Sequence, residues 1–187
     1  MNSPLRWATQ RYMDVETFLA MGGKTPGGRV LEMGCGNGRG VELILNHFGA
    51  SHVDAFDMDA GMVALAKKRL ARRGQQVAVW QGDAAVMPLA TASYDAVFDF
   101  GIIHHVVPWR MAVAEAHRVL KTGGKFYLFE LLAPFIQHPL WRTLLEHPQE
   151  DRFDDSQMAK QLQEQGFTLL GRRSLLGQVA WYVGRKD

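Results

Sequence analysis

The chain has 187 residues, of which 47% are hydrophobic and 21% are charged, so it has enough apolar material for one globular domain with a substantial core. The formal net charge is only +2, which does not favour a nucleic-acid-binding protein. The single cysteine, Cys35, excludes an intrachain disulfide and any three-cysteine iron–sulfur motif. The N-terminus lacks an apolar signal core, and no stretch has the roughly 18 apolar residues of a membrane span, so we predict a cytoplasmic protein.

Residues 5–20 carry apolar side chains at mixed three- and four-residue spacing. This pattern predicts one or two amphipathic helices ahead of the first strand. The aromatic residues Trp7, Tyr12 and Phe18 then either cover a ligand pocket or pack on the core, and aromatic residues at helical spacing commonly do the latter.

Between Arg29 and Gly40 a short apolar run breaks into a glycine-rich turn. The run predicts a buried parallel strand, and the glycines at 34, 36 and 38 let the backbone turn sharply or approach a ligand closely. Helical apolar spacing follows from Val41 to Phe48. A strand, a glycine loop and a helix start are typical of a nucleotide-type site, because the free N–H groups at a helix start favour a negatively charged ligand group.

The glycine spacing narrows the choice of ligand. A dinucleotide fingerprint, G-x-G-x-x-G counted from Gly34 and Gly36, needs a third glycine where the chain has Arg39. A phosphate-binding P-loop needs a lysine that does not occur here. NAD and P-loop nucleotides are therefore disfavoured as ligands. The alternative to a site for another nucleotide-type ligand is a tight turn that binds no ligand.

His52 to Asp57 predicts a second strand, and Asp59 offers an N-cap for a helix from Ala60 to about Arg73. Asp57 lies at the carboxyl end of this strand, where an acidic side chain can accept both hydroxyls of a ribose. Asp54 and Asp59 are competing candidates for that role, and the position within the strand favours Asp57.

The end of that helix carries five basic residues within positions 67–73. Cations near a helix C-terminus complement its dipole, so a solvated face is a better interpretation than an RNA-binding patch.

Two further strands precede candidate site residues. Val77 to Trp80 leads into Q-G-D-A at 81–84, and Tyr94 to Phe98 leads into D-F-G-I-I-H-H-V at 99–106. Carboxyl ends of strands in open α/β sheets collect ligands and catalytic groups. His104 and His105 are neighbours, so we expect only one of them to face a substrate, where it would act as a base or hydrogen-bond acceptor.

The second half of the chain predicts a helix from Met111 to Leu120 and a fifth strand from Lys125 to Leu131. Residues 133–155 then interleave three prolines with aromatic and aliphatic side chains, which indicates either a hydrophobic lid over the substrate or packing against the sheet. A helix from Asp155 to about Gln165 and an antiparallel pair of strands, Phe167 to Arg173 and Val179 to Arg185, complete the chain.

These segments together resemble a known family. The acidic-x-G-x-G-x-G pattern of Glu32, Gly34, Gly36 and Gly38 resembles motif I of the class I S-adenosylmethionine-dependent methyltransferases, the 99–106 segment resembles their motif IV, and R-V-L-K-T-G-G-K-F matches a helix-to-strand connection of the same family. The resemblance runs from residue 28 onward and is to the small-molecule type, as in the ubiquinone and menaquinone biosynthesis methyltransferases. It implies an α/β, Rossmann-like fold with a seven-stranded, mostly parallel sheet, helices on both faces and an antiparallel last strand.

The resemblance also implies a division of the chain and a set of site residues. Residues 1–27 would form an N-terminal helical cap, 28–130 the cofactor-binding core, 131–155 a variable insertion or lid, and 156–187 a helix and strand pair. Asp83 would meet the adenine amine and Ala84 the ring nitrogens, while Asp99 and Phe100 would approach the methionine moiety mainly through backbone. The full set for S-adenosyl-L-methionine is Glu32, Gly34, Cys35, Gly36, Gly38, Asp57, Met58, Met62, Asp83, Ala84, Asp99 and Phe100, with His104 and His105 as catalytic candidates.

The predicted reaction is methyl transfer to a small, partly apolar acceptor at oxygen, nitrogen or an activated carbon. Family members that methylate nucleobase amines tend to carry [D/N/S]-P-P-[aromatic] where this chain has D-F-G-I, which disfavours that substrate class. No zinc spacing occurs among the seven histidines and one cysteine, so we predict no metal. The alternatives are a nonenzymatic S-adenosylmethionine-binding regulator, an RNA or protein methyltransferase and, third, a nicotinamide oxidoreductase. We expect no clear nucleic-acid partner, and a monomer or homodimer.

Overall fold

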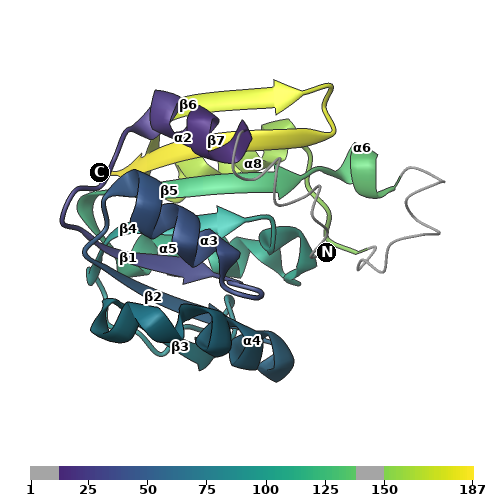
Figure 1. The fold of residues 1–187 in the computed structure, drawn as a ribbon. Helices are drawn as coiled ribbons and strands as arrows, with labels where there is room; N and C mark the ends of the chain where they lie inside the picture. The colour runs from purple at the N-terminus through teal and green to yellow at the C-terminus, as the bar shows by residue number, and fades with distance from the viewer. Residues whose placement is uncertain (1–12, 138–149) are drawn as a thin grey trace.

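In the computed structural model, which describes residues 13–137 and 150–187, the strands form one seven-stranded sheet with the order β3-β2-β1-β4-β5-β7-β6 (Figure 1). The first five strands along the chain run parallel, and β7 runs antiparallel to both of its neighbours, β5 and β6. The predicted mostly parallel sheet with an antiparallel last strand is therefore confirmed. The strands are β1 Arg29–Met33, β2 His52–Asp57, β3 Val77–Gln81, β4 Tyr94–Phe100, β5 Leu120–Leu131, β6 Phe167–Leu175 and β7 Val179–Lys186.

The strand order reverses between β1 and β4. From β1 the chain proceeds outward through β2 to β3, then returns to place β4 on the other side of β1. Crossover connections that leave a sheet in opposite directions separate at this point, so a crevice opens at the carboxyl ends of β1 and β4. The glycine-rich turn after β1 lies at that crevice.

Helices cover both faces of the sheet, as the sequence predicts (Figure 1). One face is covered by α2, α3 and α4, whose apolar side chains share a cluster with Phe18 and Phe48, and the other by α5 and α8, which pack around Trp109 and Met158. The helical segments are α2 Val15–Gly22, α3 Arg39–Leu43, the π-helix η2 Ile44–Phe48, α4 Ala60–Leu70, the 3-10 turns η3 Ala71–Gln76 and η4 Ile103–His105, α5 Trp109–Val119, α6 Ala133–Ile136 and α8 Asp155–Glu164.

Strand pairing moves two of the predicted strand boundaries, and one predicted helix ends earlier than expected. β4 continues through Phe100 instead of ending at Phe98, because Asp99 and Phe100 pair with Leu128 and Phe129 of β5. β5 begins at Leu120 and not at Lys125, because Leu120 is fully buried and pairs with Tyr94. The helix after β2 ends at Leu70, before the predicted Arg73, and continues as the 3-10 turn η3.

Helix α2 packs on the sheet. Phe18 is fully buried, and its ring lies 5.6 Å from that of Tyr127 and 6.1 Å from that of Phe98. Of the two interpretations left open for the N-terminal aromatic residues, core packing therefore holds for Phe18. Trp7 and Tyr12 lie outside the described residues.

The two described ends of the 131–155 segment also pack on the core. Ile136 and Phe153 are buried, and the Phe153 ring lies 4.7 Å from that of Trp109. Phe135, in α6, is half-buried, and Trp141, the other aromatic residue on which a hydrophobic lid would depend, lies outside the described residues. None of the helices within residues 13–137 and 150–187 combines the length and the apolarity that crossing a membrane requires.

Helix α8 begins at Asp155, as predicted, with a complete capping box in which Asp154 is the N-cap. The Asp154 Oδ1 accepts the Gln157 N–H at 2.8 Å, and the Gln157 side-chain oxygen accepts the Asp154 N–H at 2.9 Å. We expect Asp154→Ala to lower the free energy of unfolding by about 1 kcal/mol, because it leaves a helix-start N–H without its acceptor. Urea denaturation measures this loss, and Asp154→Asn, which keeps the acceptor, should recover most of it.

Candidate functional site

A cavity of about 750 Å³ opens at the carboxyl ends of the strands, where the strand order reverses. It lies between the loops that follow β1, β2, β3 and β4. Most of the predicted site residues are brought together in its wall: Glu32, Gly34, Cys35, Gly36, Asp57, Met58, Met62, Asp83, Ala84, Phe100 and His105. The wall also contains Asp59, one of the two competing candidates for the ribose site. Residues of the wall that the sequence patterns did not single out are Asn37, Arg39, Gly40, Phe56, Gly82, Ala85, Gly101, Ile102, Val106 and Val107.

The glycine-rich turn forms one side of the cavity. Gly34 has φ +64°, and a Cβ built on it would lie 2.5 Å from the Cγ2 of Ile102, so only glycine fits between the two loops. Gly38 does not line the cavity. It has φ +83°, begins helix α3, and a Cβ there would lie 2.9 Å from Leu70 of α4. Its role in this structure is to let α3 and α4 approach each other.

Glu32 is a buried carboxyl group in the cavity wall. It is 2% exposed and accepts the backbone N–H of Val41, at the start of helix α3. Burial raises its pKa well above the usual range, and the nearby charges of Asp99 and Asp57 add to the increase. Among the described residues its Oε2 has no hydrogen-bond partner, so the cavity wall presents one buried acceptor that a ligand donor can satisfy.

Asp57 is the acidic residue of β2 that reaches the cavity. Its Oδ2 accepts the Gly36 N–H at 2.8 Å and its Oδ1 accepts the Asp59 N–H at 2.9 Å. A carboxylate has about four lone-pair positions, so two of them remain for a ligand. Asp59 also caps α4 as predicted, with its Oδ1 2.7 Å from the Gly61 nitrogen.

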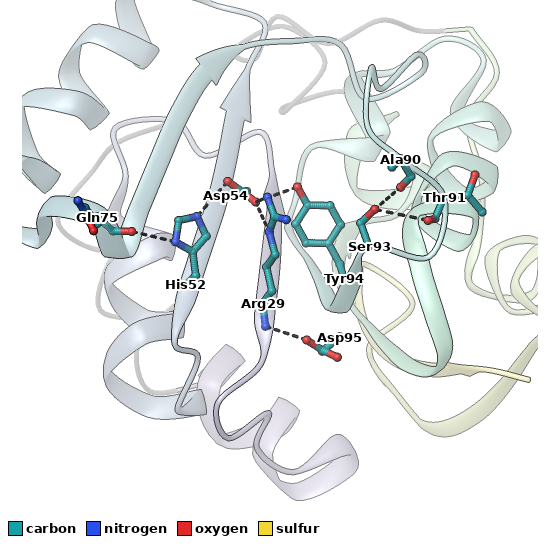
Figure 2. Close-up of polar contacts among 9 residues, drawn as sticks. All are labelled: Arg29, His52, Asp54, Gln75, Ala90, Thr91, Ser93, Tyr94 and Asp95. Carbon is teal, nitrogen blue, oxygen red and sulfur yellow. Dashed lines mark hydrogen bonds and ion pairs between the residues drawn. The ribbon is translucent and has the colours of Figure 1, made fainter.

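Asp54, the other of the two competing candidates, serves a different purpose in the first half of the same strand. Figure 2 shows its carboxylate held between Arg29, His52 and Tyr94. The Arg29 Nη2 lies 2.6 Å and the Tyr94 hydroxyl 2.9 Å from Asp54 Oδ2, while His52 lies 3.2 Å from Oδ1. This cluster, in which the Asp54 carboxylate is buried, ties β2 to β1 and β4 and is not part of the cavity wall.

The segment after β3 closes another side of the cavity. The Asp83 Oδ1 accepts the Ala85 N–H at 2.8 Å, which fixes the turn that carries Ala84 into the wall. Met58, which is 63% exposed, and Met62 add apolar surface on the side of α4.

His104 and His105 point to different places, as expected of neighbouring residues. His104 is buried and donates from Nδ1 to the Glu130 Oε2 at 2.5 Å, whereas His105 is exposed and lines the cavity. The rings of the two histidines lie 4.2 Å apart. Only His105 is therefore placed to touch a ligand, and the suggested catalytic role of His104 does not fit its position.

Asp99 is fully buried and outside the cavity wall. Its Oδ1 accepts the N–H groups of Gly101 and Ile102 at 2.9 and 2.8 Å, which shapes the loop that lines the cavity. Its carboxyl group lies close to that of Glu130. Burial together with the Glu130 charge raises the pKa of Asp99 well above its usual range.

Glu130 is the residue that the sequence analysis missed. It ends the buried part of β5 and is fully buried. An acidic residue near the carboxyl end of a predicted strand is the same signal that identified Asp57, and it would have identified Glu130 as well.

The stability of the protein should depend on pH through Glu130. Burial raises the pKa of Glu130 to about 7, from 4.5 for an ordinary glutamate. Because the folded chain binds this proton more tightly than the unfolded chain does, protonation of Glu130 favours the folded state. The contribution is fully present below pH 4.5 and is lost as the pH rises through about 7. We therefore expect the free energy of unfolding to fall less steeply between these pH values in Glu130→Gln than in the wild type, as measured by urea denaturation at each pH. Equal slopes would contradict the raised pKa.

No group of three His, Cys, Asp or Glu side chains suited to holding a metal ion occurs within residues 13–137 and 150–187.

Comparison with known proteins adds a family match. The family model described as "Methyltransferase domain" matches residues 30–124, about half of the chain. A protein of Mycolicibacterium smegmatis named "Probable S-adenosylmethionine-dependent methyltransferase" is 39% identical over 97 residues, which are 52% of this chain and 35% of that protein. The "Fatty-acid O-methyltransferase" of the same organism is 29% identical over 144 residues, 76% of this chain and 50% of that protein. The chain thus spans a third to a half of the length of these relatives.

Solved structures share the fold over nearly the whole chain. The crystal structure of an S-adenosylmethionine-dependent methyltransferase from Mesorhizobium loti aligns with a TM-score of 0.76 and 18% identity, covering 91% of this chain and 96% of that one. At this level of identity the likeness concerns the fold alone.

Proposed function

The chain belongs to the class I S-adenosylmethionine-dependent methyltransferases, and on this basis we propose that it transfers a methyl group from S-adenosylmethionine to a small, partly apolar acceptor. One observation carries the proposal. A single cavity of about 750 Å³ has carboxylates on one side and His105 with aliphatic side chains on another. The volume is within the range of roughly 300–1,000 Å³ that is typical of small-molecule sites.

The chemistry of the cavity wall fits S-adenosylmethionine. The free lone pairs of the Asp57 carboxylate suit ribose hydroxyls, and Asp83 with Ala84 suits an adenine edge. The Glu32 Oε2, buried without a hydrogen-bond partner in the described part of the chain, suits another donor group of the ligand. The glycine turn leaves room where a Cβ on Gly34 would meet Ile102. When bound, S-adenosylmethionine supplies a methyl group already activated by its sulfonium.

The acceptor side of the cavity explains the proposed substrate class. Ile102, Val106 and Val107 line this side together with His105. Burial of an apolar acceptor against such side chains contributes about 25 cal/mol per Å². A relative that aligns with 76% of this chain at 29% identity is named for a fatty-acid substrate, which supports an acceptor with apolar character.

The tasks of this chain's residues follow from their positions. The loops after β1 to β4 hold both partners in one cavity, which orients them and keeps water away. His105 is the titratable side chain on the acceptor side, so it takes a proton from an acceptor that must lose one. An acceptor that is already ionised needs no base, and His105 then only positions it.

Two measurements test the proposal. Calorimetry should show binding of S-adenosylmethionine and no comparable binding of NAD. A screen for release of S-adenosylhomocysteine across fatty acids, phenols, amines and quinone precursors should then reveal turnover. If a base is needed, His105→Ala should lose most rate at a pH at which an imidazole is neutral and little at a pH at which it is protonated. Cofactor binding without turnover on any acceptor would indicate a regulatory binding protein, and turnover only on tRNA or protein would refute the small-molecule class.

A further inference from the structure

Glu130 lies under the 3-10 turn Ile103–His105 and accepts hydrogen bonds from it. Its Oε1 accepts the Ile103 N–H at 2.7 Å and the His104 N–H at 3.4 Å. Its Oε2 accepts the His104 Nδ1–H at 2.5 Å and the Leu131 N–H at 3.2 Å. One carboxylate thus fixes both the backbone of the turn and the orientation of a ring within it.

Other groups hold the same turn from further sides. Asp99 of β4 accepts the N–H groups of Gly101 and Ile102 just before the turn, and Arg152 donates from Nη1 to the His104 carbonyl. The His105 N–H is bonded to the Ile102 carbonyl at 2.8 Å. These contacts restrict the movement of the turn, and Glu130 accepts three hydrogen bonds from it.

Glu130 is connected to the cavity through the two neighbouring histidines. Glu130 is fully buried and does not line the cavity, so it touches no ligand. The ring of His104, which it holds, lies 4.2 Å from the ring of His105 at an angle of 39°. His105 in turn lines the cavity. A shift of Glu130 would thus reach the cavity through the two histidines and the backbone of the turn.

We propose that Glu130 is a positioning residue for methyl transfer, acting through the imidazole of His104 to hold His105 against the acceptor. This inference rests on the proposed function, because only an acceptor in the cavity gives His105 something to position. A carboxylate suits the task because all of its partners are donors, and an amide in its place would set an N–H against one of them. A misplacement of about 1 Å at a reacting group can cost on the order of 100-fold in rate, so a buried residue one ring away can matter for catalysis.

The first test does not depend on activity. In NMR spectra, the ring resonances of His105 should move toward those of a freely rotating histidine in Glu130→Gln and in His104→Gln. They should not move in Asp54→Asn, which removes a buried carboxylate of β2 outside the cavity wall and controls for a general loss of stability. If Glu130→Gln does not fold, the His104→Gln variant alone tests the proposal. Its amide still donates a hydrogen bond to Glu130, but it lacks the ring that lies against His105. His105 resonances that are unchanged in the folded variants would overturn the proposal, whatever the enzyme methylates.

The second test uses turnover of the best acceptor from the screen. Glu130→Gln should lower kcat roughly 10- to 100-fold while the Kd for S-adenosylmethionine stays within about twofold. Combined with His105→Ala, it should lower kcat no further, because the residue through which it acts is already gone. Fully additive losses would show that Glu130 does not act through His105. If the screen finds no acceptor, the proposed function fails while the NMR result still decides the placement of His105.

Discussion

Replacement of Asp57 by alanine is expected to weaken S-adenosylmethionine binding by about 10- to 100-fold, which corresponds to roughly 1–3 kcal/mol for hydroxyls left without a partner. The side chain is poised for this role because its two oxygens already accept the N–H groups of Gly36 and Asp59, which fixes the carboxylate toward the cavity. Calorimetric titration of the folded variant measures the loss. The two released N–H groups are near water, so we expect only a small loss of stability.

Asp54→Asn provides the matched control for Asp57. Asp54 lies on the same strand, three residues earlier, but its carboxylate is bound to Arg29 and Tyr94 and is not in the cavity wall (Figure 2). The control variant should lose stability and keep its affinity for S-adenosylmethionine. If it loses affinity while Asp57→Ala retains it, the ribose acceptor has been assigned to the wrong end of β2.

The sequence predicts the fold best where local patterns and burial agree. β2 has the predicted bounds, because the four central residues of His52 to Asp57 are buried and the strand is followed by a helix cap. Asp57 could be placed for the same reason, since the end of a well-defined strand determines where its last side chain lies. The Asp59 cap needs only residues within its own turn, and the structure confirms it.

Pairing between distant segments is what the sequence could not show. The hairpin of β6 and β7 is predictable, but the insertion of β7 between β5 and β6 depends on contacts with β5 that leave no local pattern. Glu130 likewise meets His104 across 26 residues. The regular spacing of the three motif glycines also predicts the same role for each of them. In the structure, Gly34 lines the cavity, whereas Gly38 packs against Leu70.

The largest loss of stability is expected for Gly40→Ala. Gly40 lies in helix α3, where alanine would ordinarily be favoured over glycine by about 1 kcal/mol. Here a Cβ would overlap the Oε1 of Glu32 and lie 2.9 Å from Phe100, and both of these side chains are buried and held in place. Overpacking of this kind costs about 1–3 kcal/mol or more, so the clash outweighs the helix preference. Displacement of Glu32 should also weaken S-adenosylmethionine binding.

Gly61→Ala is the matched control, because it makes the same change at the start of helix α4. A Cβ at Gly61 would approach only the exposed Asp59 side chain, at 3.0 Å. We therefore expect this variant to have unchanged or slightly higher stability, so that the same substitution has opposite effects at the two sites. Urea denaturation of both variants measures the contrast. If Gly40→Ala is as stable as Gly61→Ala, the Glu32 carboxylate does not lie against helix α3, and the wall of the cofactor cavity is built differently from the one described.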